Sequence, residues 1–168
     1  MKPMIFDAHC DTILEMLNQN QELKKNSLHL DLERLRQYEE YIQVFAAFID
    51  QKEISCSPVT QCVKMLEKIH SEIERNREDV MLILSADDLT TAIEEKKCGA
   101  ILSIEGGEAL AGSLENLWMY DKLGVRLITL TWNYANEIAD GICESRGGGL
   151  TEFGRKAVAA MEALGIVV

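Results

Sequence analysis

The sequence predicts an α/β fold in which parallel strands alternate with helices. Short apolar runs, such as YIQVFAAFI at 41–49, are typical of strands that are buried on both faces. Longer stretches between these runs carry apolar residues at helical spacing. Strands that are apolar on both faces and separated by helices pair in parallel through right-handed crossovers, which gives the predicted fold class.

The expected elements follow one another along the whole chain. Strands are expected at 4–9, 41–49, 80–84, 99–104 and 125–132, with the start of another at 166–168. Helices are expected at 11–18, 31–37, 59–76, 85–97 and 114–123, and between Thr151 and Gly165. The helix at 59–76 has a predicted buried face made of Val59, Cys62, Val63, Leu66, Ile69 and Ile73.

Capping residues fix several of the helix ends. Ser57 is an expected N-cap, and Ser85 forms a capping box with Asp88. Thr151 caps the last helix, and Gly165 is placed to end it in a left-handed conformation.

Both an open doubly wound sheet and a (β/α)8 barrel fit this order of elements. No glycine-rich phosphate loop follows the first strand, whereas His and acidic residues stand at strand ends, which favours the barrel. A complete barrel usually needs about 250 residues and rarely fewer than about 200. We therefore expect residues 1–168 to be a single incomplete domain, the N-terminal portion of a (β/α)8 barrel that this chain does not close.

Composition limits the possible partners and compartment. Hydrophobic residues make up 47% and charged residues 27%, and no run of 18 apolar residues occurs, so we expect a globular protein without a membrane span. The net charge of −11 argues against nucleic-acid or anionic-membrane partners. The five cysteines are an odd number without a close pair, which suggests buried thiols in a reducing compartment. An acid at position 7 interrupts any signal peptide, so a cytoplasmic location is expected.

The end of the first strand carries the tripeptide His9-Cys10-Asp11. Alternate side chains of a strand point to the same face, so His9 and Asp11 project together and Cys10 projects away. One imidazole and one carboxylate on a shared face are suitable ligands for a divalent metal. A structural alternative is open: His9 could be a buried histidine bonded to a carbonyl, and Asp11 the N-cap of the next helix.

Glu105 occupies the corresponding end of a later strand. It follows an apolar strand and precedes Gly106-Gly107, where the backbone can turn sharply, so it is placed to converge with His9 and Asp11. Its two oxygens could bridge two cations. The alternative is a solvated loop acid.

A polar segment follows the strand at 125–132. Trp132, Asn133, Asn136 and Asp140 are candidates for lining a substrate pocket. Asn and Asp also favour loops for local hydrogen bonding, and this interpretation has equal weight.

At these residues the chain resembles the membrane (renal) dipeptidase family of zinc peptidases. The resemblance extends over essentially all of the chain. The segments that carry it are FDAHCDT at 6–12, LHLDLERLRQ at 28–37, QVFAAFI at 43–49, LSIEGGEAL at 102–110, LGVRLITLTWNYANEIADG at 123–141 and GLTEFGRKAVAAMEALGIVV at 149–168.

The resemblance implies a (β/α)8 barrel that hydrolyses dipeptides by metal-activated water at a site with two zinc ions. It implies that His9 and Asp11 bind the first zinc and that Glu105 is the bridging, catalytic carboxylate. Many members have a substrate-contacting His where this chain has Trp132. The family's other zinc-binding histidines lie beyond residue 168, so the expectation is a truncated chain with ligands mainly for one ion and little or no activity.

A non-catalytic function is the alternative. An unclosed parallel sheet exposes edge strands, here at 4–9 and 166–168, and exposed edges pair with other chains. The chain could then act as a half-barrel that self-associates into a homo-oligomer or pairs with a partner chain.

Overall fold

The computed structural model describes residues 3–50 and 52–168. Its contacts divide the chain into two compact units. The first unit comprises residues 1–47 and 65–102, and the second comprises 48–64 and 103–168. Two strands and one helix begin in one unit and end in the other, so the division passes through continuous elements.

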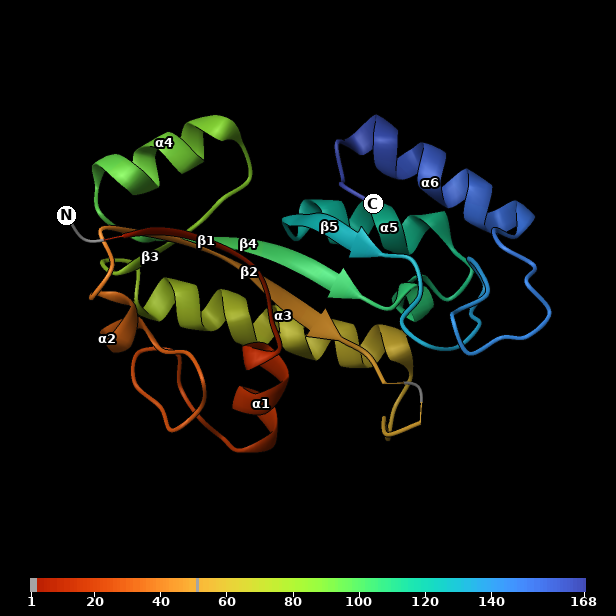
Figure 1. Ribbon diagram of the computed structural model, residues 1–168, viewed down its shortest axis with the longest axis horizontal. Coiled ribbons are helices and arrows are strands. Elements are labelled where there is room, and N and C mark those ends of the chain that lie inside the picture. The colour runs from red at the N-terminus through yellow and green to blue at the C-terminus, as the bar shows by residue number, and fades with distance from the viewer. Residues whose placement is uncertain (1–2, 51) are drawn as a thin grey trace. The chain divides into compact units, whose positions relative to one another are not determined.

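The first unit contains most of a parallel sheet (Figure 1). In chain order its elements are β1 (Met4–Cys10), α1 (Thr12–Asn18), α2 (Leu32–Leu35), β2 (Glu40–Phe48), α3 (Pro58–Arg75), β3 (Val80–Leu82), α4 (Ala86–Glu94) and β4 (Cys98–Glu105), of which β2, α3 and β4 extend into the second unit. The strands lie in the order β1-β2-β4-β3. The pairs β1–β2 and β3–β4 are parallel, which confirms the predicted α/β class.

An irregularity in β1 changes which way its last side chains point. Asp7 pairs with Gln43, but the next recorded pair is Cys10 with Phe45. Two residues of β1 therefore lie opposite one residue of β2, which is the arrangement of a β-bulge. The bulge shifts by one residue the alternation of side chains between the two faces of β1. The sequence pattern did not predict this bulge.

Helix α3 has a buried face close to the predicted one. Cys62, Leu66 and Ile69 are at most 1% exposed, as the spacing predicts. Met65 is also fully buried, whereas Val63 is 45% exposed, so the prediction for Val63 was wrong. The buried positions follow a narrow stripe with steps of three and four residues, and Val63 lies beside that stripe. In the part of the chain that the structure describes, no helix is long and apolar enough to cross a membrane.

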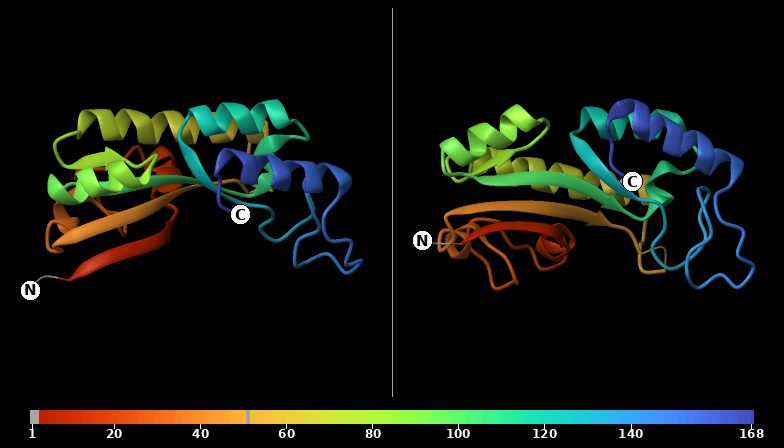
Figure 2. Two further views of the ribbon diagram at one scale, coloured as in Figure 1. Left: turned by 90° about the horizontal axis from the view of Figure 1, so that it is seen from above. Right: turned by 45° about the horizontal axis from the view of Figure 1, so that its top comes forward.

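The second unit continues the α/β pattern. Its further elements are the short 3-10 helix η1 (Gly107–Leu110), α5 (Leu114–Lys122), β5 (Val125–Thr129) and α6 (Glu152–Leu164). Strand β5 pairs with β4, and α5 and α6 lie side by side (Figures 1 and 2). The predicted strand at 125–132 ends three residues early, at Thr129, because Leu130 and the following residues form a turn.

The caps predicted at Ser85, Thr151 and Gly165 are confirmed, and the strand predicted at 166–168 is present only as a single bridge. The Ser85 hydroxyl accepts a hydrogen bond from Asp88 N at 3.3 Å, and the Thr151 hydroxyl accepts one from Gly154 N at 2.9 Å. Gly165 ends α6 with a φ of 72°, a conformation that glycine adopts without strain. Beyond it, Val167 forms a parallel bridge with Leu127 of β5.

Candidate metal centre

The end of β1 presents His9 and Asp11 at the surface. Their side chains are 47% and 51% exposed, so His9 is not the buried histidine of the structural alternative. Asp11 stands at the N-cap position of α1, yet its side chain makes no capping hydrogen bond. The Asp11 carboxylate is therefore not used to cap the helix.

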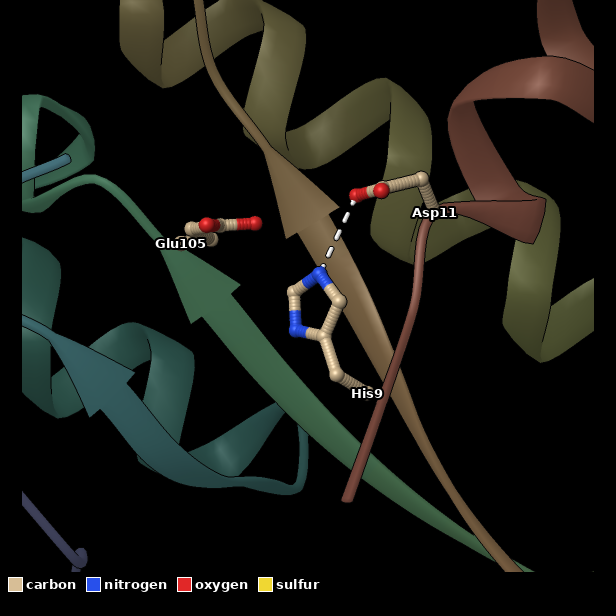
Figure 3. Close-up of side chains that lie close together, drawn as sticks. All are labelled: His9, Asp11 and Glu105. Carbon is tan, nitrogen blue, oxygen red and sulfur yellow. Dashed lines mark ion pairs between the residues drawn. The ribbon is translucent and has the colours of Figure 1, made fainter. Parts of the chain in front are cut away.

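His9 and Asp11 point toward each other (Figure 3). His9 Nε2 lies 3.4 Å from Asp11 Oδ1. Two ligands bound tetrahedrally to zinc at 2.0–2.1 Å are separated by about 3.4 Å, so this spacing fits a shared ion. Cys10 lies between them in the sequence, and burial raises the pKa of its thiol to about 11. The thiol is thus protonated at neutral pH and is a poor ligand or nucleophile.

Glu105 is the last residue of β4, and two glycines follow it. Its carbonyl accepts a hydrogen bond from Ile49 N at 3.1 Å, which ties the end of β4 to the residue that follows β2. Gly106 has a φ of 101°, a region that other residues rarely adopt. A side chain on Gly107 would meet Leu130 O at 2.6 Å. The sharp turn predicted after Glu105 is therefore confirmed.

The structure brings the three predicted metal ligands together. His9, Asp11 and Glu105 each offer one ligand atom, and these atoms lie within 4.8 Å of one another. Figure 3 shows two of the side chains coming from the end of β1 and the third from the end of β4. Among residues 3–50 and 52–168, this is the one group of three or more His, Cys, Asp or Glu side chains spaced to hold a metal ion. Their role as ligands stays a prediction.

A hydrogen-bonded cluster supports the end of β1, and sequence reasoning missed it. The Asp7 carboxylate accepts hydrogen bonds from His9 N at 3.1 Å and from the Tyr41 hydroxyl at 3.2 Å. Gln43 Nε2 donates to Asp7 O at 3.3 Å. Burial and the Asp7 carboxylate raise the pKa of Tyr41, so its hydroxyl stays a donor. An acid inside an apolar strand, two residues before His9, is the signal that could have identified this cluster.

A cavity of about 450 Å³ opens beside the His9–Asp11 pair within the first unit. Besides these two residues, its lining includes Arg34, Tyr38 and Tyr41. The pair therefore borders a space large enough for a small ligand.

Trp132 and Asn133 lie in the second unit, in the turn after β5. The Trp132 ring is 40% exposed and contacts Phe48, with ring centroids 4.8 Å apart in an edge-on arrangement. Phe48 ends β2, and the adjoining Ile49 is hydrogen-bonded to Glu105, so this aromatic pair lies near the end of β4. Asn133 O accepts a hydrogen bond from Cys143 N at 2.9 Å, which closes the loop on itself.

Asn136 and Asp140 use their side chains within their own loop. Asn136 Nδ2 donates to Leu130 O at 2.8 Å, and Asn136 Oδ1 accepts from the Ile138 amide at 2.8 Å. Asp140 accepts hydrogen bonds from Arg146 Nη2 at 2.7 Å and Nε at 3.0 Å, and from Gly148 N at 2.8 Å. These contacts are the turn chemistry that the sequence offered as the alternative to a pocket role.

The family model for membrane dipeptidase, peptidase family M19, matches residues 1–168. An uncharacterised dipeptidase of Schizosaccharomyces pombe is 31% identical over 154 residues, which is 83% of this chain and 37% of the relative. Dipeptidase 3 of Mus musculus is 29% identical, and the match covers 98% of this chain and 35% of the mouse protein. The chain thus spans about a third of the length of these curated relatives.

Solved structures show the same fold. A dipeptidase AC, a metallopeptidase of family M19, superimposes with a TM-score of 0.84 at 22% identity, over 99% of this chain and 56% of that one. A metallopeptidase from Rhodobacter sphaeroides, bound to a phosphinate mimic of the dipeptide L-Ala-D-Ala, also gives 0.84, at 20% identity, over 99% of this chain and 58% of that one. These likenesses confirm the barrel type of fold, whose sheet the five strands described for this chain do not close. With the family model matching along its whole length, this chain belongs to the membrane dipeptidase family, M19.

Proposed function

We propose that His9, Asp11 and Glu105 hold a zinc ion and that the protein hydrolyses dipeptides. The observation that carries the proposal is the grouping of one imidazole and two carboxylates with ligand atoms within 4.8 Å of one another. Imidazole nitrogen and carboxylate oxygen are ligands that zinc takes in hydrolytic sites. Membership of a dipeptidase family supports the choice of substrate.

The donor set is suited to hydrolysis at neutral pH. Bound zinc polarises a carbonyl oxygen and lowers the pKa of water toward neutrality. His9 and Asp11 are about half exposed, so a substrate has access to the pair. Glu105 has a second carboxylate oxygen for a further cation, and a two-zinc site is the arrangement we propose for the complete centre.

Of the four candidate pocket residues, Trp132 and Asn133 are proposed to contact the substrate. The exposed Trp132 ring, held by Phe48, offers an apolar surface for a substrate side chain. Asn136 and Asp140 are proposed to shape this loop instead of touching the substrate, because their side chains are hydrogen-bonded within it.

Metal binding and hydrolysis test the proposal together. Calorimetric titration with zinc should give binding that is lost in His9→Ala, Asp11→Asn and Glu105→Gln. The exposed α4 variant Asp87→Asn is the matched control and should bind as the unaltered chain does. Release of D-alanine from Gly-D-Ala, measured with zinc-loaded protein, tests the activity. Zinc binding that survives all three ligand substitutions would overturn the proposed site.

Self-association is a second candidate function, favoured by the surface of β1. Met4 is 66% and Phe6 63% exposed on this strand, which pairs with β2. Exposed apolar residues on an edge strand favour pairing with another chain. Light scattering should then show a dimer or larger species that Phe6→Lys disperses. A monomer at all concentrations would exclude this function.

A further inference from the structure

Asp7 on β1 accepts three hydrogen bonds, one from β1 itself and two from the neighbouring strand β2. Its two carboxylate oxygens accept hydrogen bonds from His9 N at 3.1 Å and from the Tyr41 hydroxyl at 3.2 Å. Its own carbonyl accepts one from Gln43 Nε2 at 3.3 Å. Gln43 is fully buried and also donates to Val44 O, so β2 provides a fixed base for these contacts.

These contacts lie where the register of β1 shifts. In a regular strand Asp7 and His9 would share a face, but the extra residue between Asp7 and Cys10 separates them. Bulges alter the direction of side chains and disturb the local ladder of hydrogen bonds. The Asp7 carboxylate accepts the His9 amide hydrogen within the bulge, so it holds His9 in the conformation that turns the imidazole toward Asp11.

We propose that Asp7 is a positioning residue for the metal centre, acting through the bulge that directs His9. The role rests on the proposed function, since it gives the His9–Asp11 pair its 3.4 Å spacing for a shared ion. Asp7 is not one of the three residues whose ligand atoms lie within 4.8 Å of one another, and each of its carboxylate oxygens accepts a hydrogen bond. Residues that orient metal ligands without touching the metal commonly affect metal affinity about 10- to 100-fold when they are replaced.

Cobalt(II) titration followed by visible absorption tests this role. Asp7→Ala removes both carboxylate contacts and should weaken Co²⁺ binding about 10- to 100-fold and alter the cobalt absorption bands. Asp7→Asn should restore affinity and spectrum, because its amide oxygen can accept from His9 N while its NH₂ group donates to the Tyr41 oxygen. Tyr41→Phe removes one contact and should cause a smaller loss. Asp87→Ala, on the exposed start of α4, is the control and should change nothing.

Hydrogen exchange in the metal-free protein tests the effect of Asp7 on the bulge independently of metal binding. The His9 amide hydrogen should exchange with solvent faster in Asp7→Ala than in the unaltered chain, while Asp87→Ala leaves it unchanged. If Asp7→Ala does not fold, judged by circular dichroism, Tyr41→Phe takes its place in both experiments.

Each outcome separates the role of Asp7 from the proposed function. If the unaltered chain binds no Co²⁺, the proposed metal site is wrong and this role is wrong with it. If the unaltered chain binds Co²⁺ and Asp7→Ala binds it equally well with the same spectrum, the role of Asp7 alone is overturned. An Asp7→Asn variant as weak as Asp7→Ala would also overturn it, since the charge of Asp7, and not its hydrogen bonds, would then matter.

Discussion

Two acidic sites in the first unit have opposite surroundings. Glu72 on α3 is fully buried, and its carboxylate accepts from Leu23 N at 2.8 Å, Lys68 Nζ at 2.9 Å and Arg75 Nη1 at 2.7 Å. The side chains of His9 and Asp11 are about half exposed and border a cavity. A carboxylate surrounded by protein donors stabilises the fold, whereas the exposed imidazole and carboxylate beside a cavity are proposed to bind an ion. Substitutions at the two sites should therefore change different properties.

The largest expected effect is on stability, at Glu72. Glu72→Ala should lower the free energy of unfolding by about 3–5 kcal/mol, because it leaves Lys68 and the buried Leu23 amide without their acceptor. Glu72→Gln should cost less, since the amide oxygen still accepts hydrogen bonds. Urea unfolding followed by circular dichroism measures both. The exposed Glu94→Ala is the control and should stay within about 0.5 kcal/mol. A loss no larger in Glu72→Ala than in this control would contradict the structural role.

The opposite result is expected at His9. His9→Ala should weaken Co²⁺ binding at least about 100-fold, because a ligand is lost and even residues behind ligands contribute 10- to 100-fold. Without metal, its unfolding free energy should change by less than about 0.5 kcal/mol, as for other exposed positions. Cobalt titration and urea unfolding of the metal-free protein measure the two quantities. A large loss of metal-free stability with unchanged cobalt affinity would reverse the comparison.

Zinc itself should stabilise the chain through the same pair. At a free zinc concentration ten times the Kd, the free energy of unfolding should rise by about 1.4 kcal/mol, because the proposed site exists only in the folded state. EDTA should remove the gain. Asp11→Asn should show none of it, whereas Glu94→Ala should show all of it. Thermal unfolding with and without zinc measures the effect, and an equal gain in Asp11→Asn would place the ion elsewhere.

Local sequence signals predicted the order of the elements and the helix caps well, whereas β3 and β5 end before the predicted residues. Ser85, Thr151 and Gly165 cap helices as expected, because each acts through its own backbone and near neighbours. The sequence pattern predicted that His9 and Asp11 would lie together, and they do, although Asp11 follows the end of β1 and the register of β1 shifts before Cys10. These interactions join residues that are only a few positions apart, so they can be predicted from the local sequence.

Contacts between segments distant in sequence account for what was missed. The bulge between Asp7 and Cys10 depends on Tyr41 and Gln43, more than thirty residues away, and no feature of β1 alone requires it. The exposure of Val63 depends on which side of α3 is covered, and helical spacing allows more than one boundary for the buried face.

The smallest expected effect is on the pH dependence of stability, at Asp140. Hydrogen bonds from Arg146 and then from Gly148 N hold the pKa of its carboxyl below the usual 3.8. A lowered folded-state pKa stabilises the protein above the unfolded-state pKa, and this stabilisation is lost as the pH falls through the folded value. Asp140→Asn should therefore be less stable than the unaltered chain at neutral pH, and the difference should shrink as the pH falls below 3.8. Urea unfolding at a series of pH values measures this, with Asp87→Asn as the control.

The same variant separates loop structure from substrate binding. Because Asp140 is saturated by its own loop, as Glu72 is by its neighbours, Asp140→Asn should leave the cobalt affinity unchanged. A KM for Gly-D-Ala that rises in Asp140→Asn, with no pH-dependent loss of stability, would place this carboxylate at the substrate instead. Hydrogen bonding to protein donors would then not distinguish carboxylates that stabilise the fold from carboxylates that bind the substrate.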